Sequence, residues 1–330
     1  MRYIFLATLV FAASPLAAED PDIGAIVERH VLPGYATLAA ESANLADSAE
    51  ADCTAGNPTL TDAYHSAFDD WISVSHLRFG PSERDDRAFA LAFWPDPRGS
   101  TPKALMGLIR DEDPVVLNPS DFATVSVAAR GFYALEFLLF DPQFSDAGNP
   151  PYLCNLIKAV TADIAANAEA ISDGWQTEYA ALMLNPGNDT YRTQTEAAQQ
   201  FFTALSTGLE FTSQTRLARP MGSFDRPRPN RAEARRSERS LRHVSLSLEG
   251  TRALAMMISN GNPEVGTAFE AALQRAADLD DPVFAGVAEP RGRFRVEALQ
   301  QSIDGIRDLL ALEVGPDLGI AAGFNSLDGD

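Results

Sequence analysis

Helical periodicity runs through almost the whole chain and constrains its fold more than any other feature. Apolar residues recur every three or four positions, and the alternation typical of β-strands is nearly absent. Breaks rich in proline and glycine divide the helical stretches. The pattern therefore predicts an all-α fold. The predicted helices cover about 23–45 with a kink at Pro33 and Gly34, 59–79, 120–140, 152–184, 190–218, 232–259, 264–278 and 294–313.

The helices divide evenly along the chain, with four before residue 186 and four after it. A length of 330 residues suits two cores better than one. We therefore expect two helical-bundle domains of about four helices each, at residues 19–186 and 187–330. The equal counts would fit a duplication, although the sequence shows no residue-level repeat.

The N-terminal residues have the features of a secretory signal peptide. Arg2 supplies a positive charge, Tyr3–Phe11 an apolar run, and Ala17-Ala18 a small-residue cleavage site. The run is too short to span a bilayer, and no later segment is long and apolar enough to do so. We therefore predict that residues 1–18 are removed and that the rest is a soluble exported protein, periplasmic in a bacterium, and not an integral membrane protein.

The net charge of −20 argues against sequence-independent binding to nucleic acid, whose phosphates repel an acidic protein. Nine arginines between Arg216 and Arg242 are a local exception. They could pair with acidic residues of the other domain, bind an anion through their planar guanidinium groups, or hold a partner protein.

Two cysteines, Cys53 and Cys154, are present. In an oxidising compartment they favour one disulfide over two separate thiols, and this bridge would stabilise the fold by roughly 4–5 kcal/mol. The chain has no C-x-x-C or H-x-x-x-H spacing, so a structural zinc site is not predicted.

Glu136 is unusual because it lies in "RGFYALEFLL" (residues 130–139), the most apolar helical stretch. A buried, unpaired charge costs several kcal/mol, so this carboxyl needs a partner, a proton or a cleft. It could pair with an arginine, of which Arg130 is the nearest, or with backbone donors. Alternatively, Tyr133, three positions earlier on the same face, could join Glu136 as a ligand for a hard cation.

A second helix supplies weaker candidates for the wall of a cleft. Trp71, His76 and Arg78 lie near the end of the predicted helix 59–79, beside the Gly80-Pro81 break. Ends of elements often line binding sites. We include these three side chains, together with Arg130, as weak cleft-wall candidates.

Several short phrases resemble the imelysin-like proteins, also called peptidase family M75. The phrase "GFYALEFLLF" (131–140) is similar to the family's G-x-H-x-x-E motif, with Gly131 and Glu136 in place. The chain also contains the family-like phrases "RFGP" (78–81) and "FWPDP" (93–97) before this stretch and "GFNSLDGD" (323–330) after it, in the same order as in the family. The resemblance implies an exported, all-helical, two-domain protein with the motif near the domain interface. It also implies a role in bacterial iron uptake or regulation.

The chain departs from this pattern at Tyr133, which stands where the family has histidine. A phenolate could replace the imidazole and favour ferric iron, or the site could have lost its metal and kept Glu136 for a hydrogen-bond network or another ligand. The loss also makes a metallopeptidase activity less plausible, so we do not expect an enzyme.

The resemblance thus implies binding of iron or an anionic iron chelate in an interdomain cleft, with Tyr133 and Glu136 as ligands. An inner-membrane iron transporter or another periplasmic protein would be the partner. The alternative is a metal-independent ligand-binding or interaction module.

Overall fold

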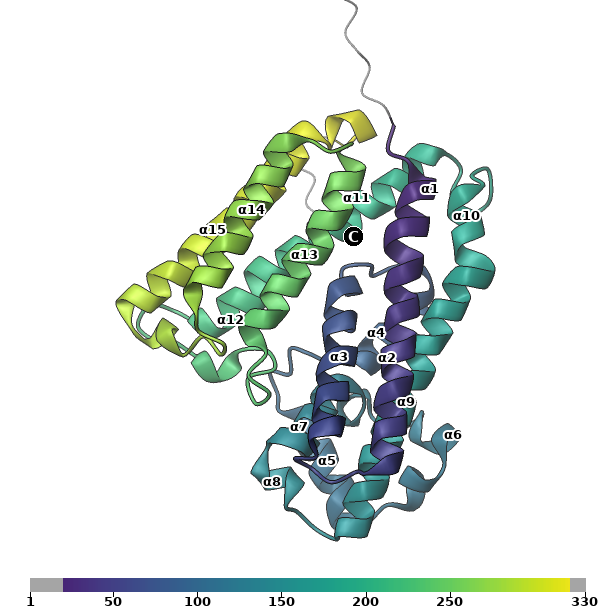
Figure 1. Cartoon of the computed structure of the whole chain (residues 1–330), viewed down its shortest axis with the longest axis vertical. Helices are drawn as coiled ribbons and strands as arrows, with labels where there is room; N and C mark the ends of the chain where they lie inside the picture. Colours follow the sequence, from purple (N-terminus) through teal and green to yellow (C-terminus); the bar gives the residue numbers. More distant parts are fainter. Residues whose placement is uncertain (1–19, 321–330) are drawn as a thin grey trace, which may run out of the picture.

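A computed structural model describes residues 20–320 (Figure 1). Within this range the regular structure is helical, and the only β-pairing recorded is an isolated bridge between Ser223 and Arg226. The all-α prediction is confirmed. The predicted signal peptide (1–18) and the closing phrase at 323–330 lie outside the described residues.

The longest helices of the first half pack together. α2 lies against both α3 and α9, and these three form the tall part of the molecule in Figure 1. At Val27–Val31, just before the kink expected at Pro33 and Gly34, the helix widens into a π-helical turn. The bounds are α1 (Ile23–Ile26), α2 (Leu32–Ala51), α3 (Pro58–Val74) and α9 (Pro150–Gly174), which continues through the π-helical Trp175–Tyr179 into α10 (Ala180–Leu184).

Short helices fill the stretch between α3 and α9, and they include the segment with Glu136. The continuous helix predicted at 120–140 is wrong, because the α-helical conformation ends at Phe122 and resumes at Gly131, with only a 3-10 turn at Val127–Ala129 between them. The short helices are α4 (Arg87–Leu91), α5 (Ser100–Asp111), α6 (Pro119–Phe122), α7 (Gly131–Phe140) and α8 (Pro142–Ser145).

The second half forms another bundle, in which α14 packs against α13 and α15, and α13 against α11. Here the helix predicted at 232–259 begins only at Ser240, so residues 232–239 are irregular, with positive φ at Ala234 and Glu238. The bounds are α11 (Gln194–Glu210), continuing through the π-helical Phe211–Leu217 into α12 (Ala218–Met221), then α13 (Ser240–Ile258), α14 (Pro263–Leu279) and α15 (Pro290–Glu313).

The two halves meet where α13 packs against α3. Buried apolar residues of both halves belong to one continuous cluster, from Ile23 to Leu318. The predicted domain boundary near residue 186 therefore stays a prediction.

A disulfide joins Cys53 to Cys154, with 5.2 Å between their Cα atoms. It links the end of α2 to the start of α9 and closes a loop of 101 residues, which confirms the predicted bridge. Among the described helices, none has the length and apolar character needed to cross a membrane.

Candidate functional site

The motif helix α7 starts at Gly131 because only glycine fits there. Its φ is +74°, and a Cβ would lie 2.2 Å from the carbonyl oxygen of Ala90 and 2.3 Å from that of Leu91. Any side chain would therefore clash with rigid backbone. This close contact fixes the first turn of α7 against the end of α4, and it sets the direction of Tyr133 and Glu136.

Glu136 is buried, and backbone donors hold it. Its Oε1 atom accepts hydrogen bonds from the N–H groups of Arg236 (2.9 Å) and Ser237 (3.0 Å) and from the Ser237 hydroxyl (3.0 Å). Burial raises the pKa of the Glu136 carboxyl, while the Ser237 N–H and the Arg236 charge oppose that rise. Glu136 thus attaches the irregular segment 232–239 to α7. This arrangement counts against the expected role of Glu136 as a metal ligand.

Arg130 is not the partner of Glu136. Its guanidinium makes two hydrogen bonds to Asp163 on α9, of 2.9 and 2.7 Å, and a third to the carbonyl of Ala123. Arg130 is also not among the residues that line the cavity described below. It fixes the entry to α7 and lies away from the site.

Tyr133, one turn before Glu136, contacts a second buried carboxylate. Its hydroxyl donates to Oε1 of Glu233, while Nε of Arg216 donates to Oε2 over 2.7 Å. Nδ1 of His243 lies 3.4 Å from the same oxygen. Glu233 is 1% exposed and Arg216 3%, so this ion pair lies inside the protein.

The protonation states follow from these contacts. Burial alone would raise the pKa of the Glu233 carboxyl, but Arg216, His243 and Tyr133 more than offset it and lower this pKa to about 2. Burial and the adjacent Glu233 charge raise the pKa of Tyr133 well above its ordinary value. Tyr133 is therefore a neutral donor at physiological pH, which works against the phenolate ligand that the sequence suggested.

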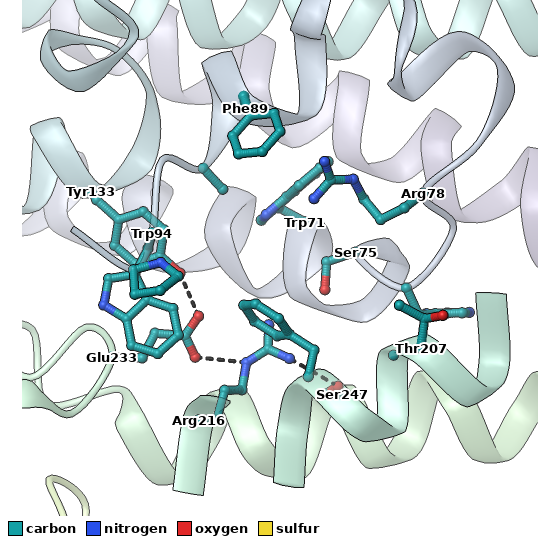
Figure 2. Close-up of a pocket in the computed structure, with 15 residues that line it drawn as sticks. Trp71, Ser75, Arg78, Phe89, Trp94, Tyr133, Thr207, Arg216, Glu233 and Ser247 are labelled. Atoms are coloured by element: carbon teal, nitrogen blue, oxygen red, sulfur yellow. Dashed lines mark hydrogen bonds and ion pairs between the residues drawn. The ribbon is translucent and has the colours of Figure 1, made fainter. Parts of the chain in front are cut away.

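A cavity of about 260 Å³ lies next to this cluster. Figure 2 shows Trp94, Tyr133 and Glu233 on one side, Arg78 and Ser75 on the other, and Phe89 and Arg216 at opposite ends. Four of the sequence candidates line it: Trp71, His76, Arg78 and Tyr133. Glu136 and Arg130 are not among its described lining residues. Of the expected ligand pair, Tyr133 and Glu136, only Tyr133 is therefore among the described residues that line the cavity.

His76 pairs with a histidine that the sequence analysis did not single out. Nε2 of His76 lies 3.0 Å from Nε2 of His30. Burial lowers the pKa of His30 to about 4 and that of His76 well below its ordinary range, so both rings are neutral near pH 7. Nδ1 of His76 is buried and has no hydrogen-bond partner among the described residues. This nitrogen has almost no accessible surface, so it is a buried polar atom without a partner in the described structure.

Among residues 20–320, no group of three or more His, Cys, Asp or Glu side chains could hold a metal ion. The two motif-associated carboxylates are already occupied, Glu136 by three donors at one oxygen and Glu233 by Arg216 and Tyr133. The guanidinium of Arg216 supplies the positive charge beside Glu233.

The arginine-rich stretch has several of its charges neutralised within the chain. Arg236 binds Asp141 over 2.7 Å, and both Arg239 and Arg242 bind Asp69. Asp69 and Asp141 belong to the first half. These ion pairs match the first of the three roles predicted for the stretch, in which its arginines pair with acids of the other domain.

Comparison with known proteins agrees with this architecture and motif. The family model described as imelysin, peptidase M75, matches residues 31–310.

The chain belongs to the imelysin family.

Its curated relative "Iron-regulated protein A" from Synechococcus elongatus is 22% identical, and the alignment covers 94% of this chain and 90% of that protein. An imelysin-like protein from Psychrobacter arcticum has a similar structure, with a TM-score of 0.71 and 20% identity over 92% of this chain and 96% of that one. A putative iron-regulated protein A precursor from Parabacteroides distasonis gives a TM-score of 0.70 at 12% identity, covering 88% of this chain and 94% of that one. At these identities the two structures show a shared fold.

Sequence reasoning missed three residues that line the cavity, namely Glu233, Trp94 and Ser247, and it named Arg216 only as the first arginine of the basic run. Glu233 lies in "RAEARRSERS", where the pattern predicted a helix, and it is one of only two acids there. An acidic residue in a basic run was a usable signal for a local ion pair. Trp94 stands inside the quoted phrase "FWPDP", but nothing in that phrase indicated a cavity.

Proposed function

We propose that this protein is an exported iron-handling protein that binds a compact organic anion, such as an anionic iron chelate, in the cavity beside Tyr133. The observation that carries the proposal is the composition of the cavity, where aromatic walls meet the guanidinium groups of Arg78 and Arg216. At about 260 Å³ it has room for roughly nine water molecules at ~30 Å³ each. This volume suits a ligand of similar size, smaller than most drug-like molecules.

Arg78 is the cation best placed to bind the ligand's charge. Its side chain is 35% exposed and pairs with Glu83, which is 40% exposed and is not among the described lining residues. Exposed ion pairs are worth at most about 1 kcal/mol, so a ligand carboxylate can compete for this guanidinium. Arg216 is less available because Glu233 already neutralises it.

A chelate or chelator fits this cavity better than a bare ion. A free cation would need several unprotonated oxygen or nitrogen donors directed at one point. Here Tyr133 keeps its proton, and its hydroxyl donates to Glu233. A ligand that carries its own metal-binding oxygens does not need such donors from the protein.

The iron connection rests on the relatives, of which two are called iron-regulated protein A. The exported location rests on the N-terminal sequence and is consistent with the disulfide, since disulfides persist in oxidising compartments. In this setting the protein would pass its ligand to an inner-membrane transporter or another periplasmic protein.

Isothermal titration calorimetry tests the proposal, with purified protein titrated separately with ferric citrate, iron-free citrate, salicylate and zinc chloride. We expect at least one organic anion to bind and zinc not to bind. Arg78→Gln should weaken that binding about tenfold, because a charged hydrogen bond contributes about 1.5–3 kcal/mol.

Arg84→Gln is the matched control, since Arg84 forms a comparably exposed ion pair with Glu178 and is not among the described lining residues. It should leave binding unchanged. Binding of zinc alone, or equal effects of the two arginine substitutions, would contradict the proposal.

A further inference from the structure

Five of the fifteen residues that line the cavity are phenylalanine, tyrosine or tryptophan, and they come from separate segments. Trp71 lies on α3, Phe89 on α4, Trp94 in the following loop, Tyr133 on α7 and Phe211 in the π-helical turn after α11. A cavity for a fully aliphatic ligand would not need rings on so many elements.

Three of these rings form a corner. The planes of Trp94 and Tyr133 are nearly parallel, at 27° with centroids 6.1 Å apart. Phe211 meets Trp94 edge-on at 77° and 5.9 Å. Guanidinium groups lie over two of these rings, Arg219 over Trp94 at 5.6 Å and Arg216 over Phe211 at 4.9 Å. A flat ring entering beside them can still make the stacked or edge-on contacts that aromatic pairs favour.

The polar side chains of the lining include the guanidinium groups of Arg78 and Arg216 and the hydroxyls of Ser75, Thr207 and Ser247. The Arg78 guanidinium lies over the face of the Phe89 ring, 5.1 Å from its centre. The Ser75 hydroxyl donates to the carbonyl of Ile72 and can still accept.

This charge balance suits a single negative charge. Arg216 and Glu233 cancel, His76 is neutral, and Arg78 is the remaining cation among the described lining residues. A ligand with three carboxylates would leave two of them against aromatic walls without counter-charges. One carboxylate beside Arg78 and one hydroxyl at Ser75 would each meet a polar side chain of the lining.

From these observations we infer that the ligand is a planar aromatic hydroxy acid, with one carboxylate bound by Arg78 and its ring held between Trp94, Phe211 and Phe89. The inference rests on the proposed function and narrows its ligand from a compact organic anion to an aromatic one. The adjacent carboxylate and phenol oxygens of such an acid are a chelating pair for ferric iron, to which phenolate oxygen binds well. With its carboxylate bound by Arg78 and its hydroxyl at Ser75, the acid would be held in its metal-free form.

The test uses salicylate as the probe and its ring-saturated analogue as the control, with calorimetry and the fluorescence of the tryptophans. Two of the chain's three tryptophans line the cavity, so a ring stacked there should change their emission. We expect salicylate to bind at least about tenfold more tightly than the saturated analogue. Equal affinities for the two acids would overturn the inference.

Two phenylalanine variants locate the binding. Phe89→Leu keeps an apolar side chain at a position that is 47% exposed, so folding should be retained, and it should weaken salicylate binding about three- to tenfold. Phe224→Leu is the matched control, because Phe224 is also exposed beneath an arginine, Arg293 at 5.9 Å, and it is not among the described lining residues. Equal effects of the two variants would overturn the inference.

The outcomes also separate this inference from the proposed function. Binding of citrate in the Arg78-dependent manner, without binding of salicylate, would overturn the aromatic ligand and leave the proposed function standing. No binding of any organic anion would overturn both. Salicylate binding that depends on Arg78 and Phe89 would support both.

Discussion

Two buried carboxylates meet at the segment 232–239, since Glu136 on α7 binds its backbone and Glu233 belongs to it, and their surroundings lead to opposite protonation behaviour. Glu136 is 2% exposed and Glu233 is 1% exposed, so both lose nearly all contact with water. Neutral donors hold Glu136, namely the N–H groups of Arg236 and Ser237 and the Ser237 hydroxyl. A full positive charge, Arg216, holds Glu233 at 2.7 Å.

The comparison shows how the partner's charge decides the outcome when burial is equal. Burial raises the pKa of both carboxyls, and only beside Arg216 is the rise reversed, to about 2 at Glu233. Three hydrogen bonds satisfy the Glu136 oxygen but do not fully replace its hydration. The hydrogen bonds of Glu136 attach the first half of the chain to the second. Glu233 instead forms an internal ion pair with Arg216 at the wall of the cavity.

The largest effect is expected from breaking the ion pair. Arg216→Met leaves Glu233 buried without its cation, so the free energy of unfolding should fall by about 3–5 kcal/mol. Chemical denaturation measures this value. The double variant Arg216→Met/Glu233→Gln should recover much of the loss, because no unpaired charge remains. The control Arg84→Met removes an exposed pair and should cost less than about 1 kcal/mol. A loss in the single variant no larger than in this control would contradict the ion-pair account.

The two carboxylates should also give opposite pH dependence. The folded-state pKa of Glu233 is about 2 against an ordinary 4.5, so its stabilisation is complete above pH 4.5 and disappears as the pH falls toward 2. This difference corresponds to about 3 kcal/mol. The stability difference between wild type and Glu233→Gln should therefore shrink over this range.

Glu136 should behave in the reverse manner. Its folded-state pKa is raised, so its contribution is most favourable below pH 4.5 and is lost as the pH rises through that higher value. The stability of wild type relative to Glu136→Gln should thus increase on acidification. If the stability differences between wild type and Glu233→Gln and between wild type and Glu136→Gln changed with pH in the same direction, the contrast between the two carboxylates would be wrong.

The smallest effect is expected at Glu136 itself. Glu136→Gln keeps an oxygen that can accept from Arg236 and Ser237, so the free energy of unfolding should change by less than about 1 kcal/mol. Glu136→Ala leaves those buried donors unsatisfied and should cost about 1–3 kcal/mol more. Denaturant titration near pH 7 compares the two variants. If glutamine destabilised the protein as much as alanine, the charge of Glu136 would matter more than its hydrogen bonds.

The irregular segment 232–239 shows where sequence reasoning met its limit. Its residues include Ala, Glu and Arg, which are good helix formers, and the predicted helix included them. In the structure, two of its N–H groups point at the carboxylate of Glu136, about 100 positions earlier in the chain. A contact over that separation overrides local propensity, and no periodic pattern within the segment could reveal it.

The sequence by itself determined the helical class, the family motif, the disulfide between Cys53 and Cys154, and the need of Glu136 for a partner. These follow from local spacing and from the cost of burying a charge, which hold wherever the chain folds. Only the tertiary structure decided that this partner is a backbone turn near Ser237, and that Arg216 and Glu233 meet Tyr133 beside an aromatic cavity. The physical reason is that these groups lie about 80–100 residues apart, and only the packing of the second half against α3 and α7 brings them together.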